Sequence, residues 1–225
     1  LINRVQDLLD CEGAFAMDSL FGEFGDCLEN ILSGRDFKRF FDKYIAEKVA
    51  GKVRGNEGWR VCFRVDKSEE EGWLEIANRV RDVLVASGDA ISIHDVLSQL
   101  PHLDREVVLR ICQENIKDAI LFSLDEIEYL KLLEMYYLPD DFADVVTNFV
   151  TQTELNYGVA SIVLFESEFD LRFGSGFRVN YGLEDDSVFK QVVTASFQKD
   201  SCYEWKKDTF VCCQQKIVSN VAEAF

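Results

Sequence analysis

Four polar residues along one short predicted helix have side chains suited to reading nucleic-acid bases. They are Arg105, Arg110, Gln113 and Lys117. Arginine and glutamine form paired hydrogen bonds to guanine and adenine edges in the major groove of DNA, and a helix fits that groove. Glu106 and Glu114 share the outward face and weaken this interpretation, because carboxylates repel phosphates. The helix is therefore a candidate DNA-binding element, with packing or protein contact as the alternative.

A second set of cations lies in residues 35–67, which hold ten basic and five acidic residues. Helical spacing places most of them away from the apolar stripe of the helix predicted after Asp36. Such a patch would attract a polyanion. Alternatively, these cations pair with the acids of residues 1–34 and of Glu69 to Glu71, as a solvated ion-pair surface or a partner-facing charge match. The candidates for nucleic-acid contact are Lys38, Arg39, Lys43 and Lys52.

The overall charge argues against nucleic-acid binding by the C-terminal half. The formal net charge is -17, and residues 82–225 hold 11 basic and 25 acidic residues. A surface of that sign repels a polyanion over about 8 Å at physiological salt. A later predicted helix also begins with Glu184, Asp185 and Asp186, which would face phosphates directly. Non-specific nucleic-acid binding by residues 82–225 is therefore disfavoured, and we expect that residues 139–225 do not read DNA.

The residue types needed for catalysis or metal binding do not come together at recognisable spacings. The seven cysteines include no Cys-x-x-Cys pair, and the two histidines have no cysteine at ligand spacing. The segment "FGSGF" lacks the remaining residues of a phosphate-binding loop, and the acids of "LPDDF" suit the start of a helix. The sequence thus predicts no enzyme, no cofactor, and no catalytic, cofactor-binding or metal-binding residues.

Cysteine usage and hydropathy indicate the compartment. An odd number of scattered cysteines, mostly with apolar neighbours, is typical of reduced thiols in the core of a cytoplasmic or nuclear protein. No apolar run approaches the length needed to cross a bilayer. The opening "LINRVQDLLD" lacks the basic start and apolar block of a signal peptide. We therefore expect a reducing compartment and no membrane partner.

Helical periodicity dominates residues 1–68, with one predicted strand. Asp18 and Asp36 are the expected caps of two helices, which Gly34 separates. The segment "GWRVCFRVD" alternates apolar and polar residues. This alternation predicts a strand with one basic face.

Residues 69–138 predict three helices followed by a β-hairpin. The first helix ends at Gly88, and Ser92 and Asp104 are the expected caps of the next two. The strands "AILFSL" and "EIEYLKL" follow, separated by Asp125. The buried face of the third helix is expected to consist of Val107, Val108, Ile111 and Asn115.

The same order of elements returns in residues 139–225. Residues 160–162 align with residues 91–93, which places a serine before the second helix in both copies. A hairpin that turns at Lys207 and Asp208 matches the earlier hairpin, and a C-terminal helix is expected to follow. Agreement in order and spacing favours an internal duplication.

Three helices followed by a hairpin, repeated in tandem, resemble the winged-helix superfamily. The resemblance covers about residues 70–215 and rests on element order and the internal repeat, not on a signature motif. It implies a mainly α (α+β) fold: a helical N-terminal region with one strand (1–68), followed by two tandem winged-helix domains with small β-hairpins (69–138 and 139–225). Many acidic tandem winged-helix proteins are assembly subunits, which is an analogy of fold and not of site.

Two main hypotheses of function follow. The first is a non-enzymatic intracellular assembly subunit or regulator in a nucleic-acid-related complex. It would bind a protein partner through exposed acids and aromatic residues of the second winged-helix domain, although most of these aromatic residues are expected in the core. The alternative is a sequence-specific DNA-binding transcriptional regulator that uses the first winged-helix domain and the basic 35–67 region. An enzyme accessory or toxin-like fold is a third hypothesis.

Overall fold

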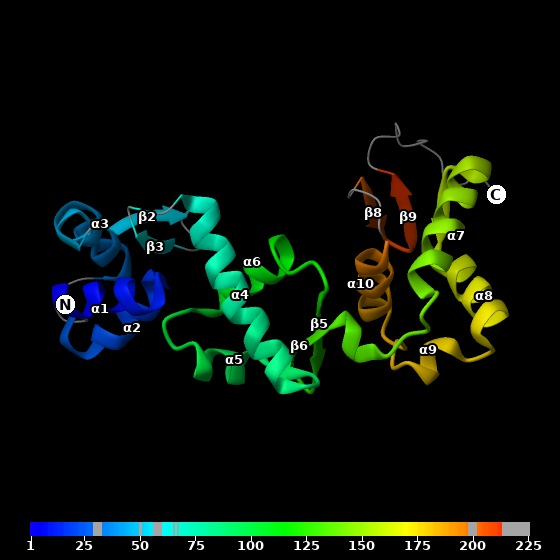
Figure 1. Ribbon diagram of the computed structural model, residues 1–225, viewed down its shortest axis with the longest axis horizontal. Helices are drawn as coiled ribbons and strands as arrows, with labels where there is room; N and C mark the ends of the chain where they lie inside the picture. The colour runs from blue at the N-terminus through cyan, green and yellow to red at the C-terminus, as the bar shows by residue number, and fades with distance from the viewer. Residues whose placement is uncertain are drawn as a thin grey trace. The chain divides into compact units, whose positions relative to one another are not determined.

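The computed structural model describes residues 1–28, 33–49, 51–55, 60–64, 66, 68–197 and 202–212 (Figure 1). Over these residues the chain is mainly helical α+β, with ten α-helices and three small antiparallel sheets. The helix predicted near the C-terminus falls on residues 213–225, outside the described residues. Within the described part of the chain, no helix combines the length and the apolar character required to span a membrane.

One order of elements occurs three times: a helix, a short strand, two helices and a β-hairpin. The first repeat, residues 2–64, consists of α1 (Ile2–Glu12), β1 (Ala14–Ala16), α2 (Met17–Leu28), α3 (Gly34–Tyr44), the 3-10 helix η1 (Ala46–Val49), β2 (Gly51–Gly55) and β3 (Arg60–Arg64). The second, residues 69–132, consists of α4 (Glu69–Ser87), β4 (Ile91–Ser92), α5 (Ile93–Gln99), α6 (Arg105–Glu114), β5 (Ala119–Leu124) and β6 (Ile127–Leu132).

The third repeat follows the 3-10 helix η2 (Leu133–Tyr136) and covers residues 142–212. It consists of α7 (Phe142–Tyr157), β7 (Val159–Ser161), α8 (Ile162–Phe173), α10 (Asp186–Ser196), β8 (Tyr203–Lys206) and β9 (Thr209–Cys212), with the short α9 (Phe177–Asn180) inserted before α10. In every repeat the last strand lies in the middle of the sheet, giving the orders β1-β3-β2, β4-β6-β5 and β7-β9-β8.

Short-range signals in the sequence set most helix boundaries. The predicted caps are confirmed at Ser92, whose hydroxyl accepts from the Asp95 amide, and at Asp104, whose carboxylate accepts from the Val107 amide. Gly88 ends α4 in the left-handed conformation, as predicted. The cap predicted for α3 is wrong by three residues. Ser33 occupies that position, because its hydroxyl accepts from the amide of Asp36 at 3.2 Å.

The N-terminal region contains three strands where the sequence predicts one. The strand β1 has three residues, too few for alternation to be visible, and β2 begins and ends with glycine. On the face of β3 that was predicted to be basic, Cys62 is buried, and Arg64 is half-buried and pairs with Asp66 at 2.6 Å. Because β3 is the middle strand, both faces are covered: Cys62 belongs to the core of the first repeat, and Phe63 packs edge-on against Trp73.

The chain forms two compact units. The first holds Leu1–Ala119 and Ser123–Lys131, and the second holds Ile120–Phe122 and the described residues from Leu132 onward. In the first unit, α4 runs from the sheet of the first repeat along α5 and α6 (Figure 1). The buried face of α6 differs from the prediction at one position. Asn115 is exposed at the helix end, and Cys112 is buried in its place.

The core of the third repeat is unusually aromatic. Phe165 lies at its centre and contacts Phe149, Phe210 and Trp205 at ring distances of 4.8 to 6.0 Å. These arrangements are the edge-on or tilted ones that aromatic rings prefer. The aromatic residues proposed from the sequence as partner contacts are buried in this core or packed against it: Phe165, Phe169, Phe173, Phe177, Tyr181, Tyr203 and Trp205. Phe165, Phe169 and Phe177 are fully buried in it, and the other four are half-buried.

Candidate functional site

The first candidate for base contact, Arg105, is held by acids at the start of α6. Its guanidinium donates to both carboxylate oxygens of Glu128 on β6, at 2.6 and 2.7 Å, and to Glu106 at 2.5 Å. The contact to Glu128 raises the pKa of Arg105 and lowers the pKa of Glu128, because each charge stabilises the other. A fork-to-fork pair of this kind occupies the same donors that a guanine would use.

The other three α6 candidates are not assembled into a basic surface. Arg110 forms an ion pair with Glu114 one helical turn later, at 2.8 Å. Gln113 is exposed on the last turn, and Lys117 is exposed beyond the end of the helix. The structure therefore brings Arg105, Arg110 and Gln113 onto one helix, but it pairs both arginines with carboxylates.

The corresponding helix of the third repeat, α10, is committed to contacts within its own unit. Asp185 caps its first turn, and Asp186 accepts from Arg178 at 2.7 Å. The side chain of Gln191 accepts from the Leu121 amide at 2.9 Å and donates to the Leu121 carbonyl at 2.7 Å. These two bonds satisfy the backbone amide and carbonyl of Leu121 on the edge strand β5, as a neighbouring strand would.

The basic candidates of the first repeat lie mainly on α3, its third helix. Lys38 pairs with Asp18 at 2.7 Å. Arg39 and Lys43 are exposed, and among the described residues neither has a carboxylate within ion-pair distance. Lys43 lies over the ring of Tyr44, with its ammonium 5.0 Å from the ring centre. Lys52 belongs to β2.

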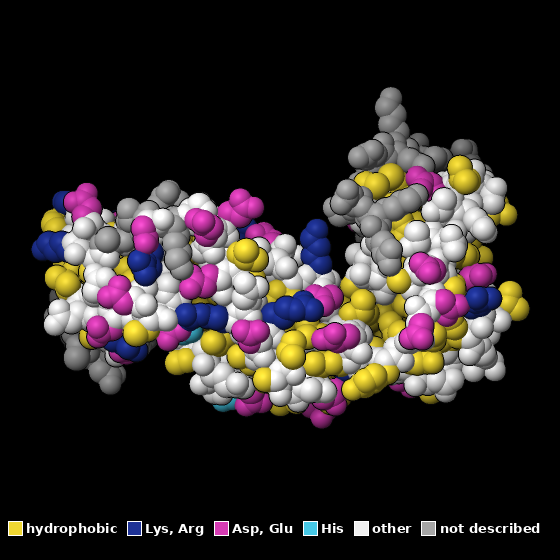
Figure 2. All heavy atoms as spheres, viewed as in Figure 1, with side chains coloured by type: hydrophobic (Ala, Val, Ile, Leu, Met, Phe, Trp, Pro, Cys, Tyr) yellow, Lys and Arg dark blue, Asp and Glu magenta, His cyan; other side chains and the backbone are white. Residues whose placement is uncertain are grey.

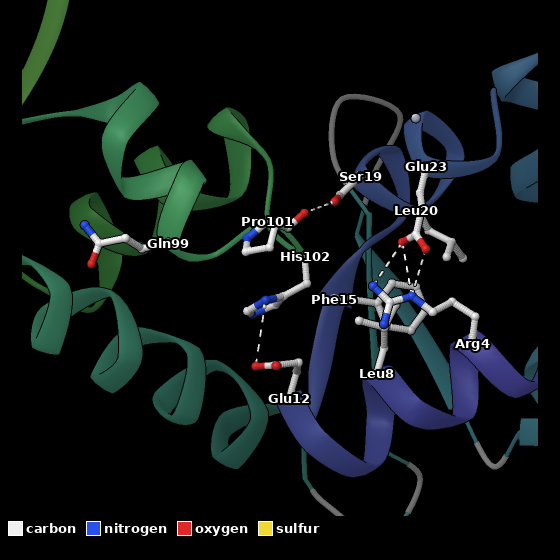
Figure 3. Close-up of a pocket in the computed structure, with 11 residues that line it drawn as sticks. Arg4, Leu8, Glu12, Phe15, Ser19, Leu20, Glu23, Gln99, Pro101 and His102 are labelled. Carbon is white, nitrogen blue, oxygen red and sulfur yellow. Dashed lines mark hydrogen bonds and ion pairs between the residues drawn. The ribbon is translucent and has the colours of Figure 1, made fainter. Parts of the chain in front are cut away.

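A cavity of about 480 Å³ lies between the first two repeats, inside the first unit (Figure 3). Arg4 and Glu23, from α1 and α2, are paired at 2.8 Å along one side of it. His102, from the turn after α5, lies near Glu12, with Nδ1 3.8 Å from a carboxylate oxygen. The rest of the lining is Leu8, Phe15, Ser19, Leu20, Gly22, Gln99 and Pro101.

Ser19, His102 and Glu12 are the three residue types of a hydrolase triad, but their arrangement differs from one. A triad requires the hydroxyl to donate to the imidazole. The hydroxyl of Ser19 instead donates to the carbonyl of Pro101 at 2.5 Å. Glu12 is engaged by Arg79, which also donates to the Cys11 carbonyl at 2.9 Å. The cavity residues therefore form a joint between two repeats, and they do not form a nucleophile and base.

The imidazole of His102 is the most buried polar group of this joint. Its side chain is 5% exposed, and Nε2 has no hydrogen-bond partner among the described residues. Burial lowers the pKa of His102 because it penalises the charged form, the nearby Glu12 carboxylate opposes this shift, and the positive charges of Arg79 and Arg4 add to it. The neutral ring is thus the form that suits this joint.

Sequence reasoning did not find this joint. Glu12 and Arg79 are 67 residues apart, and a lone histidine after Pro101 carries no recognisable spacing. A usable signal was the Pro101 break, which exposes main-chain carbonyls that a neighbouring element must satisfy. Among the described residues, no cluster of three or more histidine, cysteine or acidic side chains is arranged to hold a metal ion.

Acidic side chains are spread over both units on the face drawn in Figure 2, with Lys and Arg side chains among them. This distribution agrees with the ion pairs that hold Arg105 and Arg110 of α6 and Lys190 of α10. No protein-family model matches the chain, and no curated protein matches it.

Proposed function

We infer that the chain is a non-catalytic, intracellular protein-binding array of three winged-helix-like modules, acting as an assembly subunit or regulator. The order of helix, strand, two helices and hairpin in each repeat supports the winged-helix resemblance, as does the central position of the last strand in each sheet. The first repeat has this order as well, so the proposal extends the resemblance from two modules to three.

One observation carries the choice of protein over DNA as the partner of the second module. The arginines of α6 are already bound by Glu106, Glu114 and Glu128. In a DNA-reading helix these donors face base edges and phosphates. If the arginines turned to DNA, their ion pairs would be lost, and the unpaired glutamates would form a strongly acidic surface beside the DNA.

The hairpin turn of the second module is the proposed contact surface. Leu124 and Ile127 flank the turn and are 59% and 49% exposed. Between them Asp125 and Glu126 adopt positive φ angles, which fit a tight two-residue turn. An apolar pair around two carboxylates fits a partner protein that offers an apolar pocket with a basic rim. A phosphate backbone would be repelled by the same turn.

The proposal is tested with two matched measurements. In the first, anisotropy of a labelled mixed-sequence duplex is followed at low and at physiological salt. We expect dissociation constants above about 10 µM at physiological salt for the wild type and for Glu106→Gln with Glu114→Gln and Glu128→Gln, which removes the three carboxylates paired with Arg105 and Arg110. Tight, salt-sensitive binding by the wild type that Arg105→Glu with Arg110→Glu abolishes would overturn it.

In the second, partners captured from a lysate of the source cells are purified and titrated against the chain. Leu124→Ser with Ile127→Ser should weaken that binding at least about tenfold. Leu171→Ser, at a residue 83% exposed in α8, is the control and should leave it unchanged. Equal binding by all three proteins would exclude the turn as the contact surface.

Nucleic-acid backbone contact through α3 is the second candidate function. It is favoured by the exposed Arg39 and Lys43, which lack carboxylate partners among the described residues. In the same duplex titration, this alternative predicts binding that Arg39→Glu with Lys43→Glu removes and that Arg105→Glu with Arg110→Glu leaves intact. The two charge-reversal variants thus distinguish DNA binding through α3 from DNA binding through α6.

A further inference from the structure

Two thiols meet at the open end of the third repeat's hairpin. The Sγ atoms of Cys202 and Cys212 are 3.6 Å apart, with the Cys212 thiol donating to the Cys202 sulfur. Cys212, the last residue of β9, pairs in register with Tyr203, the first residue of β8. Cys202 precedes Tyr203 in the chain, so it lies diagonally across the hairpin from Cys212. Bond formation needs only a closer approach of two sulfur atoms already in contact.

The surroundings of the pair differ from those of the two thiols in the core. Cys62 and Cys112 are deeply buried, which raises the pKa of each thiol to about 12 and makes them unreactive. Cys202 is half-buried and next to an open edge, while Cys212 is 9% exposed beneath it. A small oxidant therefore has access to Cys202, and Cys212 is placed to react with the product.

We propose that Cys202 and Cys212 form a reversible disulfide when the protein meets hydrogen peroxide. The Cys202 thiolate attacks one peroxide oxygen: an S–O bond forms, the O–O bond breaks, and hydroxide leaves with the thiol proton as water. The Cys212 sulfur then attacks the sulfenic sulfur: the S–S bond forms, the S–O bond breaks, and a second water leaves. Two electrons pass from the dithiol to the peroxide, and a thiol reductant reverses the change.

The disulfide would fasten an edge strand. Among the strands that the structure describes, β8 lies at the edge of the order β7-β9-β8, where it is held by β9 and by side-chain contacts. Tyr203 stacks on Phe210 and lies edge-on to Phe197, at ring distances of 5.3 and 4.6 Å. A bond from Cys202 to Cys212 closes the hairpin opposite its turn, so the aromatic contacts of Tyr203 are retained when the strand would otherwise fray. This inference is independent of the proposed partner.

The test uses the folded full chain with hydrogen peroxide at about pH 8.5. The hydrogen bond shared with Cys212, followed by burial, raises the pKa of Cys202, so a mildly alkaline solution increases the reactive thiolate. We expect a mass loss of about 2 Da, recovered with dithiothreitol, and an unreduced tryptic digest that joins residues 200–206 to residues 208–216. Fragmentation of that species assigns the bond to residue 212 or 213.

Two variants and one unfolded sample make the outcome decisive. Cys213→Ser should keep the mass loss, and Cys202→Ser should lose it. In urea the same bond should form at least about tenfold more slowly, because contact between the thiols is lost. The oxidised wild type should melt about 3 °C higher than the reduced protein, and Cys202→Ser should show no such rise. No bond in the folded chain, a bond to Cys213, or equal rates in urea would each overturn the proposal.

Discussion

The carbonyl of His102 accepts a hydrogen bond of 2.8 Å from the amide of Ala16, which ties the turn after α5 to the strand β1. The preceding carbonyl, that of Pro101, accepts from the hydroxyl of Ser19. Two consecutive carbonyls of the second repeat are thus satisfied by the first repeat. The N-terminal region therefore both forms its own sheet and braces the second repeat.

Stability should fall in acid because of His102. Its pKa is lowered in the folded protein, so below about pH 6.5 the unfolded chain takes up the proton more readily than the folded one. The contribution is therefore complete above about pH 6.5 and decreases as the pH falls toward the folded pKa. Between about pH 7.5 and 5.5 we expect the wild type to lose about 1 kcal/mol more unfolding free energy than His102→Gln, measured by urea titration.

The control for this measurement is His94→Gln. His94 is the other histidine of the chain and is exposed on α5. This variant should keep the acid-dependent loss of the wild type. If His102→Gln loses stability in acid to the same extent as the wild type, the burial of the neutral ring is not the source of the effect.

Gln191 should be important for stability although it lies on an outward helix face. Gln191→Ala removes both side-chain bonds to Leu121 and leaves a half-buried amide and carbonyl unsatisfied. We expect a loss of about 1–3 kcal/mol in unfolding free energy and faster hydrogen exchange at the Leu121 amide. Gln113→Ala, at an exposed glutamine of α6, should change stability by less than about 0.5 kcal/mol. Equal effects of the two changes would contradict the role of Gln191.

Arg178 should hold the α9 insertion against the start of α10. It pairs with Glu166 and Asp186, donates to the carbonyls of Leu183 and Glu184, and lies over the ring of Phe189. Its side chain is 15% exposed, so Arg178→Ala should cost about 2 kcal/mol, after allowance for the exposed acids.

Lysine should not rescue this position, because an ammonium cannot bond to all these partners at once. Arg172→Ala is the control, since that exposed residue makes one ion pair, to Asp141. We expect it to be nearly neutral in a thermal melt. If Arg178→Lys were as stable as the wild type, a positive charge would be sufficient at this position and the several hydrogen bonds of the guanidinium group would not be needed.

Gly72 and Gly22 should respond in opposite directions to alanine. A Cβ at Gly72 would lie 2.8 to 3.1 Å from the Phe63 ring carbons Cε1 and Cγ, and closer still to Cδ1. We expect Gly72→Ala to cost about 1–3 kcal/mol through overpacking. At Gly22, in α2, no atom lies within 4 Å of an added Cβ, so Gly22→Ala should gain up to about 1 kcal/mol from helix propensity. Urea midpoints of the two variants test both signs, and a gain at Gly72 would mean that the ring moves aside.

Local features of this protein follow from its sequence, because they depend on interactions within a few residues. A serine or aspartate before an apolar period accepts a hydrogen bond from an amide two or three residues on, which predicted the starts of α5 and α6. Gly88 ended α4 because glycine tolerates a positive φ. The two hairpins around Asp125 and Lys207 followed from alternation interrupted by short polar turns.

The tertiary structure decided which charges remain available and which strand faces are covered. Glu128 is 23 residues from Arg105, and only the return of β6 beside α6 brings them together. The burial of Cys62 required elements on both sides of β3, which no alternation within one strand can reveal. The sequence alone thus determined the end of α4 and the starts of α5 and α6, since those signals act over one helical turn. Whether the candidate arginines remain available to a ligand was determined by contacts between residues far apart in the chain.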